Sequence, residues 1–90
     1  IPAPERTLNL LGYTLLRREQ PDEAVTVFRR MVELYPDSWN AHDSLGEGYM
    51  TRGDTQRAVA HYQKSLALNP ENENGIRMLK RLRASSASGE

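Results

Sequence analysis

Residues 39–72 read WNAHDSLGEGYMTRGDTQRAVAHYQKSLALNPEN, and several of their residue types recur 34 positions earlier in the chain. The matching positions at this offset are Leu11-Gly12 with Leu45-Gly46, Ala24 with Ala58, Phe28 with Tyr62, and Pro36 with Pro70. Small residues, an aromatic residue one turn after the alanine and a closing proline, repeated at this period, are typical of a stacked helix-turn-helix unit. The sequence therefore predicts a repeat protein, and the first function to consider is binding.

The composition of the 90 residues fits one small globular domain, with 38% hydrophobic and 27% charged residues. Twelve basic and twelve acidic residues give a net charge of zero, which offers no general attraction to nucleic acid or to a membrane surface. Because there is no cysteine, disulfide frameworks and thiolate metal sites are excluded. The compartment is not determined, and the cytoplasm is the default expectation. Since the chain does not start with methionine, it is expected to be a segment of a longer protein.

Five helices are predicted from the spacing of apolar residues and from the residues between them. The first covers about 5–18, and the second begins at Pro21, which is tolerated in the first turn of a helix. Asp37 or Ser38 can cap a third helix over 39–52, and Gly53 suits a left-handed helix terminus. Either Asp54 or Thr55 can cap the fourth helix, which ends at 69–70.

The fifth predicted helix covers 73–84 and carries one apolar stripe. Ile76, Leu79 and Leu82 recur every three residues among basic side chains, as in an amphipathic helix. Such a helix closes the apolar end of a repeat stack, so it is expected to act as a cap. The small polar residues at 85–90 are expected to be disordered.

These residues resemble the tetratricopeptide repeat family from about residue 5 to residue 82. The second repeat is the closer match, and the residues that carry its resemblance are Leu45, Gly46, Tyr49, Gly53, Ala58, Tyr62 and Pro70. The first repeat departs from the pattern at Leu15, where the family has tyrosine, and at Glu19, where the second repeat has glycine. Leu8 and His42 replace the tryptophan of the pattern.

The resemblance implies an all-α, right-handed α-solenoid of antiparallel helix pairs with five helices in all. The domain is expected to cover residues 1–84, with one repeat at 5–38, a second at 39–72 and the capping helix at 73–84. The first helix of each pair is implied to line a concave, peptide-binding face. The side chains expected there are Arg6, Asn9, Tyr13, Leu16, Arg17, Asn40, Asp43, Glu47, Met50, Thr51, Asn74, Arg77, Met78 and Arg81. All of these except Arg6, Thr51 and Asn74 are the candidate binding residues.

Other interpretations of the same face remain open. Asp43 and Glu47 can instead pair with Arg77 and Arg81 across adjacent helices, forming a structural lattice that contributes little stability. The segment can also be a structural or dimerisation appendage of a larger protein. It resembles, less specifically, repeat tails that follow catalytic domains in some bacterial hydrolases. A homodimer is therefore a possible state, beside a protein or peptide partner of unknown identity.

One subclass of the family uses a clamp of lysine, arginine and asparagine side chains to bind the acidic C-termini of heat-shock chaperones. The corresponding positions here are Asn9, Tyr13, Ser44, Asn74 and Met78. Since these residues supply no cation, charge-assisted bonds to a carboxylate are lost. The sequence therefore predicts that chaperone tails do not bind.

No cofactor, metal ion or catalytic group is predicted. His42, Asp43 and Ser44 are consecutive on a helix and point in different directions, so they cannot form a catalytic relay. His61 is expected to be isolated, with a surface or packing role. The arginines between residues 77 and 83 are expected to be a solvated face instead of a nucleic-acid site. The chain is thus predicted to be a non-enzymatic scaffold.

Overall fold

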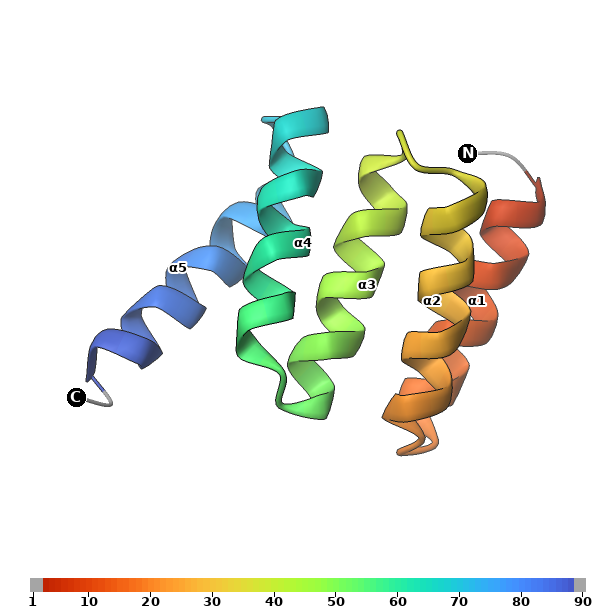
Figure 1. Cartoon of the computed structure of the whole chain (residues 1–90), viewed down its shortest axis with the longest axis horizontal. Coiled ribbons are helices and arrows are strands. Elements are labelled where there is room, and N and C mark those ends of the chain that lie inside the picture. The colour runs from red at the N-terminus through yellow and green to blue at the C-terminus, as the bar shows by residue number, and fades with distance from the viewer. Residues whose placement is uncertain (1–2, 89–90) are drawn as a thin grey trace.

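The structure is a computed structural model, described here for residues 3–88, and it consists of five α-helices (Figure 1). Their bounds are α1 Ala3–Arg17, α2 Pro21–Leu34, α3 Trp39–Arg52, α4 Thr55–Leu68 and α5 Glu73–Ser88. Helices that follow one another along the chain pack together, and α1 also contacts α3. The all-α helical-repeat fold is confirmed. Figure 1 shows α1 behind α2 at one end of the stack and α5 projecting beyond α4 at the other end.

The helix ends follow the capping chemistry expected from the sequence. The Ser38 hydroxyl accepts a hydrogen bond from the Ala41 amide at 3.2 Å, and an Asp54 carboxylate oxygen accepts one from the Arg57 amide at 3.3 Å. Gly53 ends α3 in the left-handed region with φ of 89°. The Arg52-Gly53-Asp54 tripeptide is therefore the turn between two antiparallel helices.

The C-terminal helix is longer than predicted. Helix α5 continues to Ser88, past the expected end at 84 and into the tail expected to be disordered, while 89–90 lie outside the described residues. No proline or glycine interrupts 76–88, and alanines at 84 and 87 favour the helical state. The amphipathic stripe thus predicted which part of α5 packs against the stack, but it did not predict the last residue of the helix.

An aromatic ring from the second helix of each pair lies against a glycine on the first helix. A Cβ atom added at Gly12 would be 2.2 Å from Cε1 of Phe28, and one added at Gly46 would be 3.1 Å from Cζ of Tyr62. Both rings are fully buried. A Cβ would overlap the ring at Gly12 and would be tightly placed at Gly46, so the repeat offset produces the same close helix contact twice.

A buried alanine supports each contact from the second helix, and we expect it to tolerate no larger side chain. Ala58 is fully buried, whereas Ala60 on the same helix is exposed. Replacing Ala58 by leucine should lower the free energy of unfolding by about 1 to 3 kcal/mol through overpacking. Ala60→Leu is the matched control and should change it by no more than about 0.5 kcal/mol. Urea denaturation measures both, and equal effects would contradict the predicted packing.

Glu19 and Gly53 occupy equivalent positions after the first helix of each repeat. Both adopt positive φ angles, 59° for Glu19 and 89° for Gly53, which a residue with a side chain adopts only with strain. We expect Glu19→Gly to raise the free energy of unfolding by roughly 0.5 to 1 kcal/mol, after allowing for the greater freedom of glycine in the unfolded chain. The reciprocal Gly53→Ala should lower it by about 1 kcal/mol. Thermal unfolding tests the pair, and a destabilised Glu19→Gly protein would show that the glutamate side chain has a structural role.

Candidate functional site

Helices α1, α3 and α5 carry all of the candidate binding residues, and side-chain hydrogen bonds connect these helices. The Ser44 hydroxyl on α3 donates to Asn9 Oδ1 on α1 at 2.5 Å, and Asn74 on α5 donates to the Asp43 carboxylate on α3 at 3.1 Å. We call the surface formed by α1, α3 and α5 the inner face. The residues predicted from the repeat register are therefore brought together.

The candidate residues differ in how far they reach solvent. The exposed ones are Arg17, Arg77 and Arg81. The half-buried ones are Asn9, Tyr13, Leu16, Asn40, Glu47 and Met50. Asp43 and Met78 are buried, so they form the floor of the inner face and do not project from it. The face thus combines exposed cations with half-buried apolar, polar and acidic groups.

Asparagine side chains are the partners of Asp43 in place of the arginines that the sequence suggested. Asn72 Nδ2 donates to Asp43 Oδ1 at 2.9 Å, and Asn74 Nδ2 donates to both carboxylate oxygens at 3.1 Å. Arg77 donates to Asn74 Oδ1 at 3.5 Å. Among the described residues, the four ion pairs involve other carboxylates, so the expected pairing of Asp43 and Glu47 with Arg77 and Arg81 is wrong at contact distance.

Asn72 is a residue that the sequence analysis did not single out, although it is buried at the centre of this network. Its Oδ1 accepts the Gly75 amide at 3.2 Å and caps α5, while its Nδ2 also donates to the Ser65 hydroxyl at 2.9 Å. Ser38 stands 34 residues earlier, caps α3 in the same way and donates to buried Glu5. Adding the repeat offset of 34 residues to the cap residue Ser38 gives Asn72, so the sequence contained the signal for this second cap.

Two tyrosines and a glutamate on this side of the molecule have displaced pKa values. Burial raises the pKa of Tyr13 to about 12, opposed by its hydrogen bond with Ser44, and Asp43 and Glu47 raise it further. Burial and then Asp43 raise the pKa of Glu47, while Arg81 lowers it. Burial also raises the pKa of Tyr62, whose hydroxyl has no hydrogen-bond partner among the described residues. A partly desolvated acidic centre therefore lies on α3.

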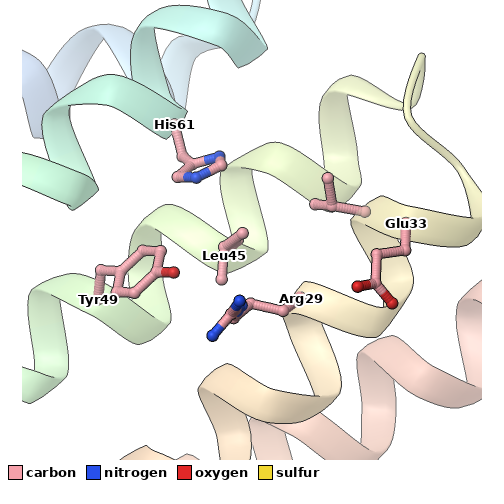
Figure 2. A pocket seen from close by; sticks show the side chains of 6 residues that line it. Arg29, Glu33, Leu45, Tyr49 and His61 are labelled. Atoms are coloured by element: carbon pink, nitrogen blue, oxygen red, sulfur yellow. The ribbon is translucent and has the colours of Figure 1, made fainter.

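A shallow cavity lies on the opposite side, between α2, α3 and α4 (Figure 2). Its volume is about 290 Å³, and the lining residues are Arg29, Val32, Glu33, Leu45, Tyr49 and His61. Figure 2 shows His61 reaching from α4 toward α3, which carries Leu45 and Tyr49, with Arg29 and Glu33 on α2. None of the predicted binding residues lines this cavity, which we call the outer groove.

His61 is not isolated as predicted, because it stacks between two rings of α3. The ring centroids of His61 and His42 are 5.5 Å apart, and those of His61 and Tyr49 are 5.6 Å apart. The turn at residues 53–54 places position 61 opposite positions 45–46, midway between His42 and Tyr49, so the hairpin register was the overlooked signal. No group of three or more His, Asp or Glu side chains able to hold a metal ion occurs in the described part of the chain.

Hydrogen bonding fixes the protons of this histidine pair. His42 Nε2 lies 2.8 Å from the Pro36 carbonyl oxygen, which can only accept, so Nε2 carries the proton. In the tautomer with its one proton on Nε2, His42 accepts at Nδ1 from Nδ1 of His61, which lies 3.3 Å away. The pair therefore connects α4 through α3 to the loop between the repeats.

Leu10, Ser44 and Met78 are equivalent positions, each 34 residues from the next, and their exposure shows which end of the stack is uncovered. Leu10 is 64% exposed, while Ser44 and Met78 are 1% and 7% exposed, since earlier helices pack against α3 and α5 but none precedes α1 among the described residues. The outer side of α1 therefore presents apolar surface. Within the described residues, no helix combines the length and apolar character needed to cross a bilayer.

The sequence profile of the tetratricopeptide repeat matches residues 9–73, which include most of both helix pairs and all of the loop between them. The chain belongs to the tetratricopeptide repeat family. This finding agrees with the repeated aromatic-on-glycine contact and with the equivalent caps at Ser38 and Asn72.

Three curated relatives share this repeat over parts of much longer proteins. The anaphase-promoting complex subunit CDC16 of Saccharomyces cerevisiae is 30% identical over 82 residues, covering 88% of this chain and 10% of the relative. The Hsp70-Hsp90 organizing protein of Triticum aestivum is 39% identical over 57% of the chain, and the human superkiller complex protein 3 is 33% identical over 67%. This tetratricopeptide chain spans between 4% and 10% of the length of these relatives.

A solved structure of a MamA mutant has the same arrangement of helices. Its TM-score is 0.79, and the match covers 96% of this chain and 63% of MamA at 21% sequence identity. At this identity the likeness shows the fold alone. Five helices in this order are thus a known tetratricopeptide arrangement.

The position of His61 predicts an acid-sensitive contribution to stability. Burial, followed by the neighbouring His42, lowers the pKa of His61 below its ordinary 6.5. Below pH 6.5, His61 binds a proton more readily in the unfolded chain than in the folded chain. Its contribution to the free energy of unfolding is therefore present above pH 6.5 and is lost as the pH falls through the pKa of the folded state. Subtracting the unfolding free energy of His61→Gln from that of the wild type should give a smaller difference at pH about 5.5 than at about 7.5.

Glu47 does not disturb this comparison, although its raised pKa gives the opposite pH dependence. The glutamate is present in both proteins, so its contribution cancels in the difference. Urea denaturation at the two pH values provides the measurement. A difference that stays constant between them would contradict the predicted role of His61.

Proposed function

We propose that this tetratricopeptide chain binds a segment of a partner polypeptide on its inner face, in a role that is not catalytic. The observation that carries the proposal is the mixture of groups on that face. Half-buried Tyr13 and Met50 offer apolar contact area, half-buried Glu47 offers a carboxylate, and Arg17 and Arg77 are exposed cations. Apolar anchors with a few polar groups between them are what recognition of a peptide requires.

The family membership supports this role, because tetratricopeptide repeats are protein-interaction scaffolds. The relatives are named for assemblies of proteins: a subunit of the anaphase-promoting complex, an organizing protein for Hsp70 and Hsp90, and a component of the superkiller complex. Each name describes a protein that works with other proteins. We infer the same general role for this chain, in which it binds another protein that the relatives do not identify.

Acidic chaperone tails are not the ligand we infer. At the positions of the family clamp, Asn9 accepts from Ser44 and Asn74 donates to Asp43, while Met78 is buried. The amides are already engaged, and none of these side chains is a cation. A terminal carboxylate would therefore find no charge-assisted bonds at these positions.

Selection from a random peptide library tests the inner face directly. Peptides that bind the wild-type chain should lose at least about tenfold in affinity against Glu47→Lys and against Tyr13→Ala. Lys64→Glu, an exposed charge reversal on α4, is the matched control and should keep the affinity. Circular dichroism shows that each variant is folded, and a tail peptide ending in an acidic motif serves as the negative ligand.

Equal affinity for all four proteins would reject the inner face as the binding site. A second candidate function, self-association through the apolar surface of α1, is favoured by the exposure of Leu10. Light scattering on the same samples separates the two. Two results together would favour the second candidate. The wild-type chain would be a dimer that Leu10→Glu converts to a monomer, and the wild-type chain would bind no peptide from the library.

A further inference from the structure

The hydroxyl of Tyr62 is a polar group that packing of the repeat does not require. The ring is fully buried against Gly46, and its Oη is enclosed with no hydrogen-bond partner among the described residues. Phe28 fills the equivalent position in the first repeat and makes the same contact with Gly12 without a hydroxyl. Buried hydroxyl groups are normally paired, so an unpaired one calls for a functional explanation.

The Tyr62 ring contacts α3 close to the two acidic residues of the inner face. It lies against Gly46, which is next to Glu47 and one turn from Asp43. The groups that act electrostatically on its hydroxyl are Glu47, Asp43 and Tyr13, with Arg81 acting in the opposite direction. The tyrosine from α4 therefore packs against α3 between the positions of the two carboxylates.

Neither carboxylate forms an ion pair among the described side chains, although Arg81 acts electrostatically on Glu47 from a greater distance. Asp43 accepts only neutral amides, from Asn72 and Asn74, and the Glu47 carboxylate has no hydrogen bond or ion pair among the described side chains. Arg81 is exposed, and its Nη1 lies 3.9 Å from Met78 Sδ. Acidic groups in a partly desolvated site without a partner favour a cation supplied from outside.

Arginine fits this arrangement better than lysine. Its planar guanidinium has five N–H donors and can reach two carboxylates on successive turns of one helix. Its aliphatic stem can pack against half-buried Tyr13 and Met50, and the ring of Tyr13 can also face the cation. The exposed Arg17 and Arg77 would at the same time favour acidic residues on either side of the bound arginine.

We propose that Asp43 and Glu47, assisted by the hydroxyls of Tyr13 and Tyr62, form a subsite for an arginine side chain of the partner polypeptide. The proposal rests on the proposed function and names the chemistry that the inner face selects. In the complex, the guanidinium holds Glu47 ionised, and the Tyr62 hydroxyl donates to the ionised carboxylate.

Peptide arrays with one fixed central residue between randomised positions test the subsite. Peptides with central arginine should bind the wild-type chain at least about tenfold more tightly than peptides with central glutamate or leucine. Glu47→Gln should abolish this preference. Glu33→Gln, an exposed glutamate on α2 that lines the outer groove, is the matched control and should retain it.

Tyr62→Phe gives a second readout that a purely structural tyrosine would not produce. Removing the unpaired hydroxyl should raise the urea midpoint of the free protein, and it should also weaken the arginine preference several-fold. With an isotope-labelled chain, N-acetylarginine amide should shift the amide signals of residues 43–47 in the wild type and not in Glu47→Gln. An unchanged arginine preference in Tyr62→Phe or in Glu47→Gln would overturn the proposal.

The outcomes separate this inference from the proposed function. Peptides that bind the inner face with no preference for arginine would overturn the subsite and leave the binding function intact. If no peptide binding depends on inner-face residues, both proposals fail. Arginine preference that depends on Glu47 and Tyr62, but not on Glu33, supports both.

Discussion

The close approach of an aromatic ring to a glycine is the contact on which the rest of the structure depends. Phe28 on Gly12 and Tyr62 on Gly46 set the distance between the two helices of each pair. Side chains along these helices can interlock only at that distance, because dispersion contacts weaken quickly with separation. The same distance brings His61 onto His42 and packs the Tyr62 ring against α3.

The caps at Ser38 and Asn72 then connect one repeat to the next. Each accepts the amide three residues ahead and donates to a group on another part of the stack, Ser38 to Glu5 and Asn72 to Asp43. The start of a helix is therefore also a junction between repeats. These bonds use neutral amides and hydroxyls, so the caps join the repeats without forming an ion pair with Glu5 or Asp43.

Most of the fold was predictable because it depends on local patterns. The period of 34 residues, the prolines and the cap at Ser38 predict helix bounds within a few residues, and those of α3 agree at both ends. The length of α5 was not predictable from its apolar stripe, since residues 85–88 extend as helix past the packed stripe. The candidate residues share one face because their helical spacing is fixed, although their role in binding remains a prediction.

The sequence alone determined the family, the order of the helices and the residues that share the inner face, because these follow from periodicity and residue type. The tertiary structure decided the partners of those residues. Asp43 meets asparagines instead of arginines, His61 meets His42, and the Tyr62 hydroxyl meets no partner within residues 3–88. Such pairings depend on the separation and rotation of whole helices, and a difference of one side-chain length between them changes which atoms are in contact.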